Sequence, residues 1–241
     1  MFETFAEIWK DHLPEEAYRN LSSYGYYHVK HLDTNLRILS TFSLVYDIMN
    51  WYVVPNHTDP LGQLQFMEEV LELAEHNNEI VYIIGHIPPG DVFTLGKYMV
   101  RYRALINRFT NIIRGQYYGH THYDEFKNVK SYRNDELSAG IVFAVPSITS
   151  YPRKNPSLRV WELDPKTWHI WDYEQHRLYV TTANKNADIV RLKPNYTEKE
   201  LYDTAEWVIA YKFRDYFNIS MEFEEIAKMI HKSKDDKEIS K

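Results

Sequence analysis

The sequence of 241 residues contains no cysteine, so disulfides, thiolate metal sites and cysteine nucleophiles are excluded. It also has no basic surplus, because 28 Lys and Arg stand against 34 Asp and Glu, a formal net charge of −6. That balance argues against a nucleic-acid-binding protein, which concentrates positive charge on one face. No apolar run approaches the ~18 residues of a membrane-spanning helix, so no transmembrane segment is expected.

The apolar content is nevertheless high enough to build a core. Hydrophobic residues make up 44% of the chain and aromatic residues 15%, and this composition excludes wholesale disorder. The length fits one large domain, or one medium domain with an appendage.

Four N-glycosylation sequons begin at Asn20, Asn56, Asn195 and Asn218. Together they favour a secreted protein. The residues after Met1 carry several charges and no apolar signal-peptide region, so secretion would require a further segment upstream.

The order of the apolar patterns predicts an α/β fold with a helical C-terminal appendage. One helix is expected over 2–13 and should end at Pro14. A second should begin at Asp59-Pro60 and continue through the apolar positions Leu64, Met67, Leu71 and Ala74. A third is expected over 98–107. Strands are expected over 36–44, 80–84, 112–118, 141–145, 159–163 and 168–173, the last two joined by a turn at 164–167. From Pro194 onward we expect helices, one opened by a Thr197/Glu200 capping box and one starting near Ser220, followed by a charged tail over 232–241.

Three histidines lie just beyond buried strands, in segments that begin with a glycine. His86 comes after the strand at 80–84, and His120 and His122 come after the strand at 112–118. Because the carboxyl ends of parallel strands converge on one crevice, these imidazoles are candidate metal ligands. In an extended segment, His120 and His122 would point to the same side. The alternative is that all three are loop histidines with ordinary hydrogen bonds.

The motifs around these histidines resemble one enzyme family. GHIPPG at 85–90, GHTH at 119–122, PSITSY at 146–151, NPSLRV at 155–160 and NHTDPLGQL at 56–64 are similar to segments of acid sphingomyelinase and its relatives among the calcineurin-like metallophosphoesterases. The resemblance covers roughly residues 5–184. GHTH alone is shared by many metallophosphoesterases, whereas the combination is specific.

The resemblance implies a sandwich of sheets covered by helices and a two-zinc site. The metals of that family supply a hydroxide that attacks a phosphodiester, while a histidine protonates the leaving group. Carried over by position, His86 and His120 would bind one zinc ion and His122 the other. Tyr151 matches a tyrosine of the substrate pocket, and the alternative is a packed aromatic at a strand end.

The remaining family ligands belong to Asp-x-His, Gly-Asp and Gly-Asn-His-Glu motifs that lie N-terminal to the matched region in the family, and the sequence contains none of them there; its one Gly-Asp pair, Gly90-Asp91, ends the GHIPPG segment. The general-acid histidine belongs with those motifs, so no catalytic residue is assigned here. We therefore expect the C-terminal part of a larger enzyme, with 1–184 from the catalytic domain and 185–241 a helical region with a charged tail.

Four functional hypotheses follow from the resemblance. The first is a secreted or lysosomal zinc phosphodiesterase that cleaves sphingomyelin at a membrane surface to ceramide and phosphocholine, with this chain inactive alone. The second is a phosphodiesterase acting on nucleotides or other soluble phosphodiesters. The third is a non-catalytic lipid-binding chain, and the fourth is a hydrolase with one zinc ion held by histidines alone.

Overall fold

The computed structural model describes residues 1–53, 58–134 and 137–219. They form two compact units: Met1–His120 with Asp124–Ala144, and Thr121–Tyr123 with the chain from Val145 onward. Each unit is described by itself. Within the described residues, no helix combines the length and apolar character needed to cross a membrane.

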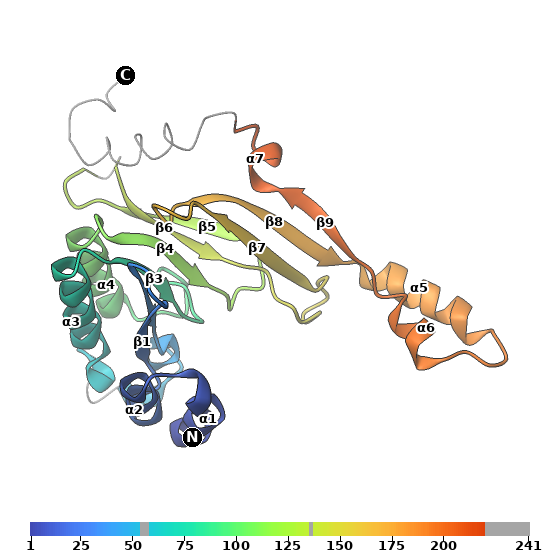
Figure 1. Cartoon of the computed structure of the whole chain (residues 1–241), viewed down its shortest axis with the longest axis horizontal. Coiled ribbons are helices and arrows are strands. Elements are labelled where there is room, and N and C mark those ends of the chain that lie inside the picture. Colours follow the sequence, from blue (N-terminus) through green and yellow to red (C-terminus); the bar gives the residue numbers. More distant parts are fainter. Residues whose placement is uncertain (54–57, 135–136, 220–241) are drawn as a thin grey trace. The chain divides into compact units, whose positions relative to one another are not determined.

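The first unit is built on a six-stranded sheet in the order β1-β2-β3-β4-β6-β5 (Figure 1). The apolar run Ile80–Ile84 forms β3, as predicted, and pairs in parallel with β2 and β4. β6 continues the parallel part beside β4, whereas β1 and β5 pair antiparallel at the two edges. The predicted α/β class is confirmed, because parallel strands alternate with helices along this part of the chain.

The elements of the first unit are α1 (Phe2–Trp9), α2 (Glu15–Tyr24), β1 (Tyr27–Lys30), β2 (Leu36–Ser40), α3 (Gln63–His76), β3 (Ile80–Ile84), α4 (Gly96–Arg108), β4 (Ile113–Tyr118), β5 (Glu125–Lys130) and β6 (Ser138–Ala144). Short 3-10 turns are η1 (Lys10–His12), η2 (Ser43–Tyr46), η3 (Trp51–Val53) and η4 (Pro60–Gly62).

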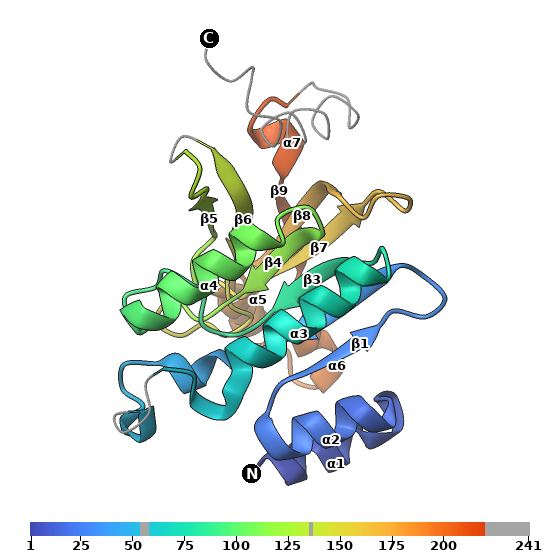
Figure 2. The same ribbon diagram turned by 90° about the vertical axis from the view of Figure 1, so that its left-hand side faces the viewer.

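Helices α3 and α4 lie side by side against one face of this sheet (Figure 2). The predicted apolar positions of α3 are all buried and join one core with β3 and α4. These positions are Leu64, Met67, Leu71 and Ala74. Burying such a stripe against the sheet is the main source of stability for a helix in this setting.

Two differences from the predictions change where an element ends or begins. The predicted strand over 36–44 ends at Ser40, because the chain turns into η2. Helix α3 begins at Gln63 and not at Pro60, since Leu61 and Gly62 have left-handed φ values of 59° and 66°. Asp59 still caps the helix from a distance, because its carboxylate accepts the amides of Leu64 and Gln65 at 2.9 and 3.0 Å.

Three elements of the first unit, α2, β1 and β5, were not predicted. Pro14 ends the first helical segment as expected, but it is also the N-cap of α2. The apolar stripe of α1 is largely exposed, with Phe5, Ile8 and Trp9 at 55%, 69% and 54%.

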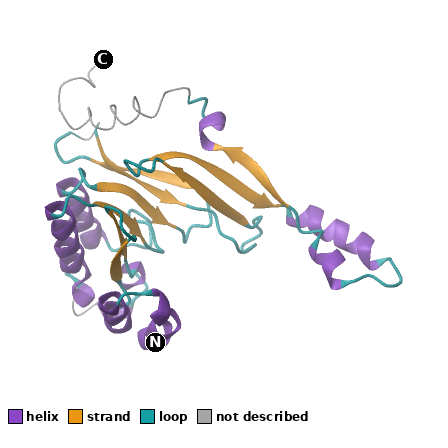
Figure 3. Ribbon diagram, viewed as in Figure 1, coloured by secondary structure: helices purple, strands orange, loops and turns teal. Residues whose placement is uncertain are grey.

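The second unit contains a three-stranded antiparallel sheet in the order β7-β8-β9 (Figure 3). Its elements are β7 (Ser157–Leu163), β8 (Ile170–Leu178), α5 (Val180–Arg191), α6 (Glu198–Tyr202), β9 (Trp207–Lys212) and α7 (Phe213–Tyr216). The predicted turn between β7 and β8 is present, and Asp164 stabilises it by accepting the amides of Lys166 and Thr167. These hydrogen bonds, chiefly those from Thr167, hold the pKa of Asp164 below its ordinary value.

The prediction of helices throughout the C-terminal region is wrong at β9. Trp207–Lys212 pairs with β8 as a strand, and exposure alternates along its first four residues as at a sheet edge. The Thr197/Glu200 capping box is confirmed at the start of α6, and α5 was not predicted. The boundary predicted after Asn184 falls inside α5. The helix expected near Ser220, the tail over 232–241 and the sequon residue Asn56 lie outside the described residues.

Candidate metal centre

His86 and His120 meet beyond the carboxyl ends of two neighbouring parallel strands. β3 ends at Ile84 beside Tyr117 of β4, and each histidine follows its strand by two residues. The Nε2 atom of His86 lies 3.2 Å from Nδ1 of His120, and the two rings are nearly perpendicular at 82°. The sequence prediction that these two side chains converge is thus realised within the first unit.

A close approach of the backbone brings His86 to this place. A Cβ atom on Gly85 would lie 2.5 Å from Oγ1 of Thr41 and 2.6 Å from the ring of Tyr118. Glycine is therefore needed for space, and the φ angle of Gly85 is not left-handed. Tyr118 is itself fixed, because its hydroxyl lies 3.0 Å from that of Tyr102. Burial raises the pKa of Tyr118 to about 12, so its hydroxyl stays neutral.

The backbone of the GHTH motif is not extended. His120 and His122 both have left-handed φ angles, 67° and 59°, so the alternation of side chains that an extended segment would give does not apply here. A non-glycine residue in this region carries strain of about 1–3 kcal/mol, and such residues cluster at functional sites. Two of them in one tetrapeptide indicate that the surrounding structure holds these imidazoles in place.

His122 belongs to the second unit, where its tautomer is set by a backbone carbonyl. Its Nδ1 atom lies 2.6 Å from the oxygen of Tyr151. A carbonyl oxygen only accepts, so Nδ1 carries the hydrogen, and Nε2 of the neutral ring is the free nitrogen. This arrangement is typical of metal-binding histidines, whose second nitrogen donates to a carbonyl or carboxylate.

The geometry of the His86–His120 pair fits two ligands of one metal ion. Two nitrogens bound to one tetrahedral zinc ion at ~2.0–2.1 Å lie about 3.3 Å from each other, close to the 3.2 Å observed. Within the described residues, no group of three or more His, Cys, Asp or Glu side chains is arranged to hold a metal ion. The two imidazoles could therefore supply at most two of the ligands that a metal ion needs.

Tyr151 is not a packed aromatic, since 74% of its surface is exposed. Phe93 was not predicted, yet its ring lies edge-on to His120 with centroids 5.6 Å apart. No periodic pattern marks Phe93, which sits in the loop between β3 and α4.

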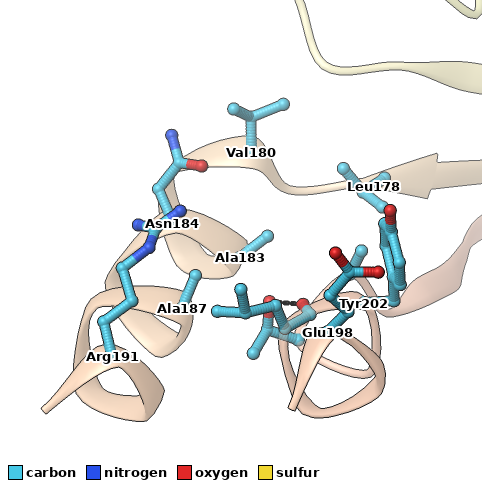
Figure 4. Close-up of a pocket in the computed structure, with 11 residues that line it drawn as sticks. Leu178, Val180, Ala183, Asn184, Ala187, Arg191, Glu198 and Tyr202 are labelled. Carbon is cyan, nitrogen blue, oxygen red and sulfur yellow. Dashed lines mark hydrogen bonds between the residues drawn. The ribbon is translucent and has the colours of Figure 1, made fainter. Parts of the chain in front are cut away.

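A separate cavity of 430 Å³ lies between α5 and α6 of the second unit (Figure 4). Its walls mix apolar and polar groups, and the polar groups come from Asn184 and Arg191 of α5, from Glu198 and Tyr202 of α6, and from Thr204. No histidine lines this cavity, so it offers none of the chemistry expected at the imidazole pair.

Comparison with known proteins gives related sequences but no matching family model. The chain is 32% identical to a sphingomyelin phosphodiesterase from Bos taurus, over 84% of its own length and 32% of the relative's. It is 29% identical to sphingomyelin phosphodiesterase B from Dictyostelium discoideum, over 91% of the chain and 33% of the relative. A cyclic GMP-AMP phosphodiesterase from Homo sapiens is 29% identical over 84% of the chain and 47% of the relative.

The chain thus spans about a third of the length of the sphingomyelin phosphodiesterases that it matches. Among solved structures, a dimetal phosphatase from Danio rerio matches with a TM-score of 0.41 and 13% identity, over 64% of this chain and 56% of that one. A likeness of that size supports no argument about the site.

Proposed function

Since the chain belongs to the acid-sphingomyelinase-like family, we propose that it forms part of a metal-dependent phosphodiesterase acting on sphingomyelin. The observation that carries this proposal is the 3.2 Å approach of His86 Nε2 to His120 Nδ1 at the ends of β3 and β4. The site chemistry and the sequence relationship point to the same reaction class, hydrolysis of a phosphodiester.

In this proposal His86 and His120 hold one zinc ion and His122 contributes to a second. Bound zinc supplies Lewis-acid polarisation of the phosphodiester and a water of lowered pKa. The chain's own residues would bind the metal and orient the substrate. Nε2 of His122 is left free to bind because Nδ1 donates to the Tyr151 carbonyl, and the exposed Tyr151 ring is available to contact substrate. The leaving-group acid and the carboxylate ligands are expected from motifs that lie N-terminal to the matched region in the family.

The proposed substrate is sphingomyelin at a membrane surface, cleaved to ceramide and phosphocholine. Several relatives are named sphingomyelin phosphodiesterase, and these names support the assignment. The second candidate is a nucleotide phosphodiester, which the relative named cyclic GMP-AMP phosphodiesterase supports. A third is a lipid-binding chain without turnover.

A parallel assay separates these candidates. Because the acid and the carboxylate ligands are expected from motifs outside this sequence, the chain is fused behind the N-terminal part of the Bos taurus sphingomyelin phosphodiesterase, supplied with Zn²⁺ and offered sphingomyelin vesicles, cyclic GMP-AMP and ATP, with the His86→Ala, His120→Ala double variant of the fusion as the blank. Phosphocholine release above the blank and faster than nucleotide cleavage supports the proposal. Faster nucleotide cleavage overturns it in favour of the second candidate, and vesicle binding without any turnover favours the third.

We further propose that the protein is secreted or lysosomal and glycosylated. Asn195 and Asn218 are exposed, and Asn20 is half-buried on α2, so attachment to the first two meets no packing obstacle. A shift in electrophoretic mobility after treatment with an N-glycosidase, in protein expressed through a secretory pathway, tests this. Asn195→Gln and Asn218→Gln should each remove part of the shift.

A further inference from the structure

The peptide groups around His86 lie where the sheet loses one of its strands. β2 runs beside β3 as far as Ser40, which pairs with Ile84. Thr41 adds one more rung, because its amide donates to the Ile84 carbonyl at 2.9 Å. Beyond this point the chain turns into η2, and no further carbonyl of β2 is available to the amides of His86 and Ile87.

The side chain of Ser43 takes the place of those carbonyls. Its Oγ atom accepts the amide of His86 at 3.0 Å and that of Ile87 at 2.7 Å. Ser43 is only 6% exposed and Ile87 3%, so water does not offer an equivalent acceptor. A buried amide without an acceptor is costly, and one hydroxyl here satisfies two.

On its other side, the main chain of His86 is held by the segment that follows β4 and leads to His120. The carbonyl of His86 accepts the amide of Gly119 at 3.0 Å, and Gly119 directly precedes His120. Residue 86 is thus held between Ser43 on the β2 side and Gly119 on the β4 side. Loss of either hydrogen bond would let the two histidine backbones shift relative to one another.

We infer that Ser43 is a positioning residue that sets the His86 imidazole against His120 through hydrogen bonds to two consecutive amides. The inference rests on the proposed function in one respect: the reason for holding the two rings together is that they are proposed to bind metal. Its geometry exists without metal, so it can be tested separately. A purely structural role for Ser43 would affect folding but leave the relation between the two rings unchanged.

The first test is amide hydrogen exchange without metal. Ser43→Ala should speed exchange at His86 and Ile87 by about tenfold or more, because both amides lose their acceptor. Exchange in the middle of β3, at Ile83, should not change. Ser43→Thr keeps the hydroxyl and should restore slow exchange, and Ser23→Ala on the exposed side of α2 is the control.

The second test measures the ring ¹⁵N chemical shifts of His86 and His120 at pH 8. In the parent chain, one of the two facing nitrogens should be protonated and the other bare, since they share a hydrogen bond. In Ser43→Ala both rings should move toward the tautomer averages of exposed histidine, with return in Ser43→Thr. If Ser43→Ala does not fold, Ser43→Cys keeps the volume with a weaker acceptor and should show the same changes.

Unchanged exchange at His86 and Ile87 overturns the inference. Faster exchange with unchanged ring shifts overturns it too, because Ser43 would then be structural only. If the parent chain shows these signatures but binds no zinc, the proposed function fails while the positioning role of Ser43 stands.

Discussion

The Nε2 atom of His86 lies 3.2 Å from the Nδ1 atom of His120, across the ends of two neighbouring parallel strands. The ladder between β3 and β4 brings the residues together, and two hydrogen bonds to the peptide groups of His86 hold them there. The pair is thus a product of strand register, and changes that disturb register near the end of β3 should disturb it.

Gly85→Ala should destabilise the protein, because the added methyl group would overlap Thr41 and Tyr118. We expect a loss of about 1–3 kcal/mol in unfolding free energy, as is usual for overpacking. Gly119→Ala is the matched control, since nothing lies within 4 Å of its Cβ position. Urea unfolding of both variants checks this, and equal stabilities would contradict the close approach at Gly85.

Asp59→Ala should weaken the start of α3. Its carboxylate accepts two helix amides and also the hydroxyl of Tyr46 at 3.0 Å. Loss of such a cap costs about 0.5–2 kcal/mol, and Asp59→Asn should cost less because the amide oxygen still accepts. Thermal unfolding of the two variants gives the order, and a reversed order would exclude the capping role.

Glu79→Gln should destabilise the protein strongly, because it removes the charge of a buried carboxylate. Glu79 is 3% exposed in its side chain, accepts from Arg37 at 2.7 Å and pairs with Lys30 at 3.2 Å. Removing one partner of a buried ion pair costs about 3–5 kcal/mol, because Arg37 then stays buried with its charge uncompensated. The fully exposed pair of Lys199 and Asp203 is the control, and Lys199→Gln should have no measurable effect on denaturant unfolding.

Stability should fall when the pH drops below about 6.5, with His28 as one cause. Burial, together with the charge of Arg37, lowers the pKa of His28 below its ordinary 6.5, although Glu16 and Glu79 act in the opposite direction. The unfolded chain then takes up a proton before the folded one, so unfolding free energy decreases from pH 6.5 down to the folded pKa.

The variant His28→Gln isolates this contribution. Its unfolding free energy should decline less steeply than that of the parent between pH 7.5 and 5.5, in urea titrations at fixed ionic strength. A slope identical to that of the parent would show that His28 does not titrate differently in the folded chain.

The central elements could be predicted from the sequence because their signals are local. Ile80–Ile84 is a continuous β-branched and aromatic run, and it forms β3 with the predicted bounds. The prediction for Trp207–Lys212 was wrong. Its apolar residues follow a capping box at helical spacing, yet the segment pairs with β8 as a strand. Pairing with a partner strand is a long-range effect that periodicity does not report.

The same limit applies to the candidate site. GHIPPG and GHTH pointed to His86 and His120, since each motif follows a buried strand. Ser43 could not be found in this way, because its hydrogen bonds to His86 and Ile87 depend on where β2 ends and η2 begins. The left-handed φ angles of His120 and His122 likewise cannot be predicted from the residue types.

Zinc titration of the 241-residue chain by calorimetry tests the central claim most directly. The account predicts binding that weakens at least about tenfold in His86→Ala and in His120→Ala, because each loses one of two facing ligands. His76→Ala, an exposed histidine at the end of α3, should bind as the parent does. No zinc binding by the parent, or equal binding by all three variants, would contradict the assignment of His86 and His120 as a metal-binding pair.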